Sequence, residues 1–238
     1  NREGAEAAIK YMFYGVLGGL FIFMAIILIY YNIGTLSYSE ISENFKTIPI
    51  HFQNIIAVFF LLGIFIKIGI FPLHFWVAKV QSASPSPISA LISGVLLNIY
   101  VYDYIRIFWD VLGFEVLKNM KLNLIIIFIS IFSSLIGHIL ALNESDIKKM
   151  LAYSTMGHLG LIVATLTLNT RLSLIAGLIY VMSHSLMKIS LFTTSGYLIQ
   201  YTKTPDLKDF KGVAYRNKSV FIGFIISAAG MIGLPPMI

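Results

Sequence analysis

Apolar segments long enough to cross a lipid bilayer recur along almost the whole chain. A helix rises 1.5 Å per residue, so about 20 apolar residues cross a hydrocarbon core of about 30 Å. We predict seven such segments, at 9–32, 52–80, 88–108, 122–142, 147–168, 172–201 and from 219 onwards. Because backbone groups in lipid need internal hydrogen-bond partners, this pattern predicts an all-α, polytopic membrane helix bundle.

Composition agrees with a membrane protein rather than a soluble one. Hydrophobic residues make up 58% of the chain and charged residues 12%, whereas soluble domains are about 25% charged. The net charge of +6 does not indicate nucleic-acid binding, because the basic residues lie mostly at the ends of apolar runs. We therefore predict a single membrane domain over residues 1–238, which we expect to be an internal piece of a longer subunit.

The basic residues also predict the orientation of the bundle. With seven spans, the side that holds the N-terminus receives roughly twice as many loop Lys and Arg residues as the other side. Cytoplasmic loops of membrane proteins carry this excess. The sequence thus predicts that the N-terminus of this chain lies in the cytoplasm.

Residues that hold metals or cofactors are scarce. The chain has no cysteine and five histidines, and the histidines show no metal-ligand spacing. These observations argue against iron–sulfur, zinc and haem sites, and no Gly-rich phosphate loop is present. We predict a chain without a cofactor or metal, more plausibly a non-catalytic subunit of an oxidoreductase complex than an enzyme in itself.

Lys67 and Pro72 lie together in the apolar run 52–80. An ionisable group at the bilayer centre costs about 2.5 to 3.5 kcal/mol on insertion scales, and a proline frees backbone groups that protein or water must satisfy. We therefore predict that Lys67 belongs to a proton or ion path beside a helix break at Pro72. The alternatives are that Lys67 snorkels to the interface or pairs with a carboxylate.

A second helix break is predicted at the C-terminal end of the chain. Gly233-Leu234 precede Pro235 and Pro236 in the last apolar segment. Pairs of interrupted helices in corresponding halves are typical of inverted repeats around a transport path. The two breaks therefore favour a transporter.

Three polar side chains recur along one face of the predicted helix 172–201. Tyr180, His184 and Lys188 are spaced i, i+4 and i+8, which places them on one side of the helix. Lipid contact and core packing explain such a face poorly, so we predict a role in the ion path. The alternative is an interhelical hydrogen-bond cluster.

Other polar residues are weaker candidates for the path. His158 lies near mid-depth in its helix, and two roles are open for it: a member of a proton relay or a structural hydrogen-bond partner. The same two roles are open for His138. Asp103 and Arg106 lie one turn apart and are expected to pair, although Asp103 could also serve as an exit group.

Four residues receive structural predictions. Ser145 can cap the helix that follows it, with Asp146 in the first turn at the positive end of the helix dipole. His74 is expected to cap carbonyls freed by the break, and Trp76 is expected to belong to an interfacial aromatic belt.

Four motifs resemble those of the antiporter-like subunits shared by respiratory complex I, Mrp-type cation/proton antiporters and membrane-bound hydrogenases. The first, a lysine followed by Pro-x-His-x-Trp and Pro-x-Pro-(Val/Ile)-Ser-Ala-Leu, matches Lys67, Pro72, His74, Trp76, Pro85, Pro87, Ser89, Ala90 and Leu91. The second, Asp-(Ile/Leu)-Lys-(Arg/Lys)-x-(Leu/Ile)-Ala-Tyr-Ser, matches Asp146 to Ser154. The third matches His184, Lys188, Leu191, Phe192, Ser195 and Gly196, and the fourth is Gly-Leu-Pro-Pro at Gly233 to Pro236.

The resemblance implies a proton-translocating subunit with two inverted half-channels joined by buried charges. Lys67 would match the lysine of the first broken helix, and Lys188 that of the connecting path. A glutamate partner of Lys67 is expected before Asn1, and a further Lys or Glu after Ile238.

One position departs from the family pattern. In many members the segment Ser-Gly-Val-Leu-Leu is followed by Lys, but here it is followed by Asn98. An amide hydrogen-bonds but does not titrate, so water or Asp103 would have to substitute for the lysine.

The sequence thus favours an ion-translocating subunit, for H⁺ and/or Na⁺, in a redox-driven pump such as a membrane-bound hydrogenase or a complex I-like assembly. Expected partners are other membrane subunits, a peripheral redox arm and the lipid bilayer, in a prokaryotic plasma membrane. The alternatives are a stand-alone Mrp-type cation/proton antiporter subunit and a non-conducting membrane anchor.

Overall fold

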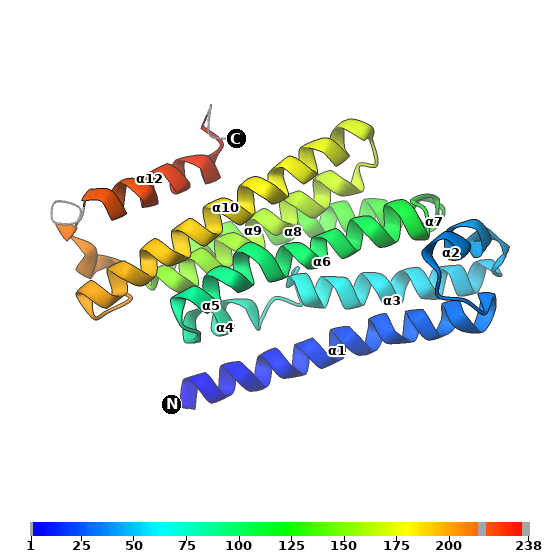
Figure 1. The fold of residues 1–238 in the computed structure, drawn as a ribbon, viewed down its shortest axis with the longest axis horizontal. Coiled ribbons are helices and arrows are strands. Elements are labelled where there is room, and N and C mark those ends of the chain that lie inside the picture. Colours follow the sequence, from blue (N-terminus) through cyan, green and yellow to red (C-terminus); the bar gives the residue numbers. More distant parts are fainter. Residues whose placement is uncertain (1, 214–217, 235–238) are drawn as a thin grey trace.

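The computed structural model describes residues 2–213 and 218–234, which form an all-helical bundle (Figure 1). Within these residues, six stretches of helix are long and apolar enough to cross a membrane. They are α1 (Arg2–Ile33), α3 (Ile50–Ile68), the composite helix Ser86–Val111, α8 (Leu122–Leu142), α9 (Ile147–Thr167) and α10 (Arg171–Thr202). The predicted fold class is confirmed.

The seventh predicted segment forms a shorter helix, α12 (Lys218–Ile232), of 15 residues. It packs along α10 (Figure 1). Pro235 and Pro236 lie outside the described residues, so the second helix break stays a prediction.

The helix break at Pro72 is confirmed. α3 ends at Ile68, and the following Gly69 has a φ of 80°, a left-handed conformation that favours glycine. The chain then passes through irregular turns, with a cis Phe71–Pro72 peptide bond, before α4 (Val77–Ala83) begins. A proline supplies no N–H and restricts the residue before it, which ends the helix here.

Neighbouring side chains satisfy the backbone groups that the break frees. The indole Nε1 of Trp76 donates to the carbonyl of Ile66 at 3.0 Å, and the amide of Phe71 donates to Ser133 Oγ at 3.1 Å. Trp76 is buried, so its assignment to an interfacial belt is wrong. His74 was expected to cap carbonyls of the break: its ring interacts with the backbone carbonyl of Pro72, although its Nδ1 is buried without a hydrogen bond of regular geometry. Trp76 caps the carbonyl of Ile66.

The third span is a composite helix. It consists of α5 (Ser86–Leu91), a π-helical turn at Ile92–Leu96, α6 (Leu97–Ile105) and a second π-helical turn at Arg106–Val111. π-Helical turns inside α-helices frequently occur at functional sites, and the first one directly precedes Asn98.

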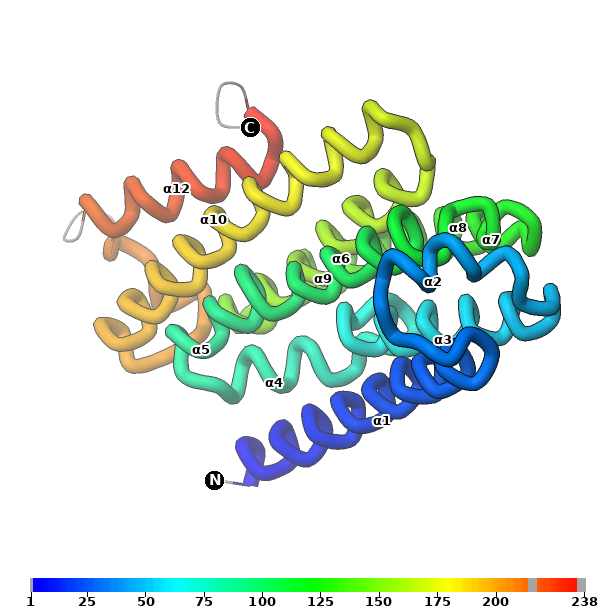
Figure 2. Tube along the Cα trace, turned by 45° about the vertical axis from the view of Figure 1, so that its right-hand side comes forward, coloured from blue at the N-terminus to red at the C-terminus, as the bar shows by residue number. Residues whose placement is uncertain are grey.

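Short helices lie at the end of the bundle opposite the N-terminus (Figure 2). They are α2 (Tyr38–Asn44), which continues into a 3₁₀ turn at Phe45–Thr47, and α7 (Glu115–Asn119). No helix is predicted at α7 from the sequence. The Lys46 ammonium lies 2.9 Å from the Glu115 carboxylate and holds the pKa of that carboxyl below its usual value.

The start of α9 differs from the prediction in its cap. The carboxylate of Asp146, rather than the hydroxyl of Ser145, accepts hydrogen bonds from the amides of Lys148 at 2.8 Å and Lys149 at 3.1 Å. Asp146 has the extended backbone of an N-cap. Ser145 instead pairs through its carbonyl with the amide of Leu207, which ties this end of α9 to the chain after α10.

α9 lies between α8 and α10 and also contacts α4. Glycines allow α8 and α9 to approach closely. A Cβ atom on Gly157 would lie 2.5 Å from the His138 ring, and one on Gly160 would lie 2.6 Å from the carbonyl of Ser130. This packing brings polar side chains of separate helices together in the centre of the bundle.

Candidate functional site

Lys188 is buried in the middle of α10, on the side that faces α9. Its Nζ donates to the carbonyl of Leu151 at 3.0 Å and to Ser154 Oγ at 2.5 Å. None of the ion pairs formed by the described residues includes Lys188. A buried ammonium held only by neutral oxygens is costly, and in a membrane span such a group indicates a functional site.

Hydroxyl groups of α9 form the surroundings of Lys188. Ser154 and Thr155 both donate to the carbonyl of Leu151, and Thr155 Oγ1 also lies 2.8 Å from Ser93 Oγ. No role is predicted for these hydroxyls from the sequence. The sequence pattern that could have revealed them is the spacing of Ser154 and His158, which lie one turn apart and therefore on one face of α9.

His158 connects the two helices. Its Nδ1 lies 2.6 Å from the hydroxyl of Tyr180, and its ring centroid lies 5.9 Å from that of His184. Tyr180, His184 and Lys188 therefore share the α9-facing side of α10, as their spacing predicts. The structure thus brings phenol, imidazole and ammonium groups together at the α9–α10 interface.

Asn98 joins the same site from the composite helix. Its Nδ2 donates to Ser185 Oγ at 2.7 Å and to the carbonyl of Gly94 at 3.0 Å, and lies 3.4 Å from His184 Nδ1. Gly94 permits this arrangement, because a Cβ there would lie 2.4 Å from Ile189 on α10.

His138 reaches the site from α8. Its Nδ1 donates to the carbonyl of Ser134 at 2.7 Å, and its ring stands edge-on to His158 at a centroid distance of 5.0 Å. We call these six residues from four helices the relay cluster: Asn98, His138, His158, Tyr180, His184 and Lys188.

Lys67 lies apart from the relay cluster. Its Nζ sits 5.4 Å from the centroid of the Tyr100 ring, two residues beyond Asn98 on α6. With Tyr11, Tyr14 and Trp76 it lines a small cavity of about 20 Å³, room for about one water molecule. None of the ion pairs of the described residues includes Lys67.

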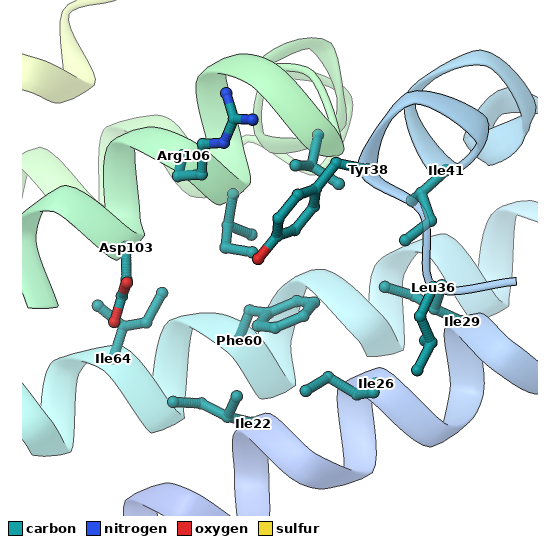
Figure 3. Close-up of a pocket in the computed structure, with 12 residues that line it drawn as sticks. Ile22, Ile26, Ile29, Leu36, Tyr38, Ile41, Phe60, Ile64, Asp103 and Arg106 are labelled. Atoms are coloured by element: carbon teal, nitrogen blue, oxygen red, sulfur yellow. The ribbon is translucent and has the colours of Figure 1, made fainter.

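Asp103 lies one turn after Tyr100 on α6 and interacts electrostatically with Lys67. It lines an apolar cavity of about 360 Å³ with side chains of α1, α2 and α3 (Figure 3). The predicted pairing of Asp103 with Arg106 is wrong, because Arg106 donates to Asp110 at 2.7 Å and stacks on Tyr38. An i, i+4 partner is within reach on the same face of a helix.

No three His, Asp or Glu side chains come together as metal ligands within residues 2–213 and 218–234. The prediction that the chain holds no cofactor stays a prediction.

The whole chain, residues 1–238, matches the model of the family described as NADH:quinone oxidoreductase/Mrp antiporter, transmembrane. It is 28% identical to the NADH-quinone oxidoreductase subunit M of Rickettsia bellii, covering 96% of this chain and 46% of that protein. It is also 28% identical to a subunit of the Na⁺/H⁺ antiporter of Alkalihalophilus pseudofirmus, covering 97% and 46% respectively. The chain therefore spans about half the length of these curated relatives.

Solved structures show the same fold. A chain of the membrane-bound sulfane sulfur reductase, described as an archaeal respiratory membrane complex, superposes with a TM-score of 0.90 at 26% identity, covering 99% of this chain and 48% of that one. A chain of the Mrp complex from Dietzia superposes with a TM-score of 0.88 at 23% identity, covering 98% of this chain and 43% of that one. The match over every residue, together with this fold, shows that the chain belongs to the NADH:quinone oxidoreductase/Mrp antiporter transmembrane family.

Proposed function

We propose that this chain is the ion-translocating core of a membrane subunit in a redox-driven pump, and that protons pass along Lys67, Asn98, His184, Lys188 and His158. The transported ion is H⁺, with Na⁺ as a possible coupled cation. The subunit works with other membrane subunits and with a peripheral redox arm that lies outside this chain.

The observation that carries the proposal is the surroundings of Lys188. Its ammonium is buried and held by a carbonyl and a hydroxyl, whereas a purely structural lysine in a membrane is expected to have a carboxylate partner or to snorkel. An amine without a counter-ion gains or loses a proton in response to nearby charges. It can therefore act as a station for a moving proton.

The relay cluster supplies the neighbouring stations. At an effective dielectric constant of about 20, two charges about 7 Å apart interact by roughly 2.4 kcal/mol, close to two pKa units. The His158 and His184 ring centroids are 5.9 Å apart, so a proton on one imidazole strongly disfavours a proton on the other. Such coupling lets a charge change at one end drive a proton off the next group.

The proposed setting is a prokaryotic plasma membrane with the N-terminus of this chain in the cytoplasm, as the distribution of loop Lys and Arg residues indicates. The similarity to subunits of NADH-quinone oxidoreductase and of an archaeal respiratory membrane complex supports a redox-driven assembly.

A second candidate is a subunit of a cation/proton antiporter without a redox partner. The similarity to part of a Na⁺/H⁺ antiporter favours it. Purification of the complete assembly decides between the two, because an iron–sulfur or NiFe subunit that co-purifies identifies the redox-driven pump, whereas Na⁺-dependent proton flux without such a subunit identifies the antiporter.

The test of ion translocation is the replacement of Lys67 and Lys188 in the complete subunit. We expect Lys67→Ala and Lys188→Ala each to abolish proton flux in membrane vesicles, measured with a pH-sensitive dye, while the assembly still forms. Lys46→Ala is the control, because Lys46 is exposed at the bundle end and its loss should leave the flux unchanged. Full flux in either the Lys67 or the Lys188 variant would refute the proposal.

A further inference from the structure

α8 carries a row of polar side chains on its buried face. Ser130, Ser133 and Ser134 are buried, and His138 follows one turn after Ser134. These residues lie at i, i+3, i+4 and i+8, so they share one side of the helix. The proposed path through Asn98 uses none of the three serines.

One end of this row contacts the helix break. Ser133 Oγ accepts a hydrogen bond from the amide of Phe71 at 3.1 Å, and the ring of Phe71 stacks on His74 at a centroid distance of 5.3 Å. His74 Nδ1 and Ser130 Oγ are both buried without a hydrogen-bond partner. Buried polar atoms of this kind are usually satisfied by bound water, so this region suits a water molecule between the break and α8.

The other end of the row contacts the relay cluster. Ser134 Oγ lies 3.4 Å from His138 Nδ1, which also donates to the Ser134 carbonyl. The His138 ring stands edge-on to His158, and His158 hydrogen-bonds to Tyr180. The row therefore extends from Ser133, which contacts the break, to Ser134 and His138, which reach the imidazoles, with Ser133 and Ser134 adjacent on α8.

We propose that α8 carries a second branch of the proton path, which joins the break at His74 to the relay cluster through Ser133, Ser134 and His138 and does not pass Asn98. The inference rests on the proposed function and deepens it. Asn98 cannot titrate, whereas every group of this branch can accept one proton while releasing another.

Proton transfer along the branch consumes no group. His138 takes up a proton on Nε2 from the His158 side and releases its Nδ1 proton to Ser134 Oγ. Each hydroxyl, and a water beside His74, accepts a proton on an oxygen lone pair and passes its own proton on. The same steps run in reverse for transfer in the opposite direction. Before a second proton follows in the same direction, each group returns to its starting hydrogen-bond pattern.

The experiment compares three variants of the complete subunit by proton flux in membrane vesicles. We expect Asn98→Leu to lower the flux only in part, because the α8 branch remains. His138→Phe should lower it by at least about tenfold, since a positioned proton-transfer group is commonly worth about 10² to 10⁴ in rate. The Asn98→Leu/His138→Phe double variant should have none.

A fourth variant separates proton transfer from packing. Asn98→Lys supplies a titrating group on the direct path and should restore flux to His138→Phe, which a packing defect at His138 would not allow. His51→Phe, on an exposed histidine at the start of α3, is the matched control. Normal flux in His138→Phe, or complete loss in Asn98→Leu alone, would overturn the branch.

These outcomes differ from a failure of the proposed function itself. If Lys188→Ala keeps full flux, the relay as a whole is refuted. If Lys188→Ala loses flux while His138→Phe does not, the relay stands and only the α8 branch is wrong.

Discussion

The contacts of Lys188, Lys148 and Lys67 separate the roles of these three lysines. Lys188 is held by Leu151 and Ser154 within the α9–α10 interface. Lys148 donates to the carbonyls of Ser82 and Ser84 at the end of the bundle, and so ties α9 to the link between α4 and α5. Lys67 contacts an aromatic ring beside the helix break. Lys188 and Lys67 lie in the spans α10 and α3, each beside further polar groups of the bundle.

The contact between Tyr180 and His158 gives a prediction about proton transfer. Tyr180→Phe removes the hydroxyl that lies 2.6 Å from His158 Nδ1 and keeps the ring. We expect reduced proton flux with normal assembly, because His158 loses the partner that orients its ring and its tautomer. Flux in vesicles is the measurement, and Tyr102→Phe, at an exposed tyrosine, is the control. Equal flux in the two variants would contradict a role for this contact.

Gly157 gives a prediction about stability. A Cβ on Gly157 would lie 2.5 Å from the His138 ring, so Gly157→Ala must shift that ring or separate α8 from α9. Overpacking of this kind costs about 1 to 3 kcal/mol. Thermal unfolding in detergent should show a lower midpoint. The control is Gly15→Ala, where nothing lies within 4 Å of the added Cβ and the helix should keep or gain stability. Equal midpoints for both variants would contradict the close packing.

At the scale of elements, the broken helix α3–α4 is the feature on which the site depends. A break in a membrane helix persists only if other groups satisfy the freed backbone. Here Trp76 and Ser133 do so from two sides. The break is therefore stabilised by α8 as well as by its own sequence, and α8 in turn contacts the relay cluster through His138.

A substitution of Trp76 tests whether its indole hydrogen bond stabilises the helix break. Trp76→Phe leaves the carbonyl of Ile66 without its indole donor, which costs about 1 to 3 kcal/mol for a buried group. Trp109→Phe is the matched control, because Trp109 Nε1 has no hydrogen-bond partner to lose. We expect a lower unfolding midpoint in detergent for the Trp76 variant than for the Trp109 variant. The reverse order would show that the Trp76 hydrogen bond does not stabilise the break.

At the scale of the whole molecule, the long helices run roughly along one direction, so the bundle has two ends (Figure 1). The N-terminus, α4 and the start of α5 lie at one end, and α2 and α7 at the other (Figure 2). In a membrane these ends face opposite compartments, and the proposed orientation places the N-terminal end in the cytoplasm.

The absence of native cysteines in this chain allows a direct test of that orientation. Lys149→Cys lies at the N-terminal end of the bundle and Glu43→Cys at the opposite end, both at exposed positions. In intact cells, a membrane-impermeant thiol reagent should label the Glu43→Cys variant and not the Lys149→Cys variant; in inverted vesicles the labelling should be reversed. The opposite pattern would place the N-terminus outside the cytoplasm.

The sequence by itself determined the six spans that the described residues form and the polar face of α10. Hydrophobic length decides whether a helix can cross a membrane, and the i, i+4 spacing of Tyr180, His184 and Lys188 is a local property of one helix. The break at Pro72 is equally local, since proline disrupts the helix that contains it.

The tertiary structure alone decided which groups these residues meet. Trp76 as a donor to the break, Ser154 beside Lys188, and His138 against His158 all depend on contacts between residues distant in the chain. Glycines at the α8–α9 contact set how closely those helices approach, and this approach places the His138 ring next to α9. A one-dimensional pattern shows which side of a helix is polar. Only the packing of several helices decides which polar side faces which.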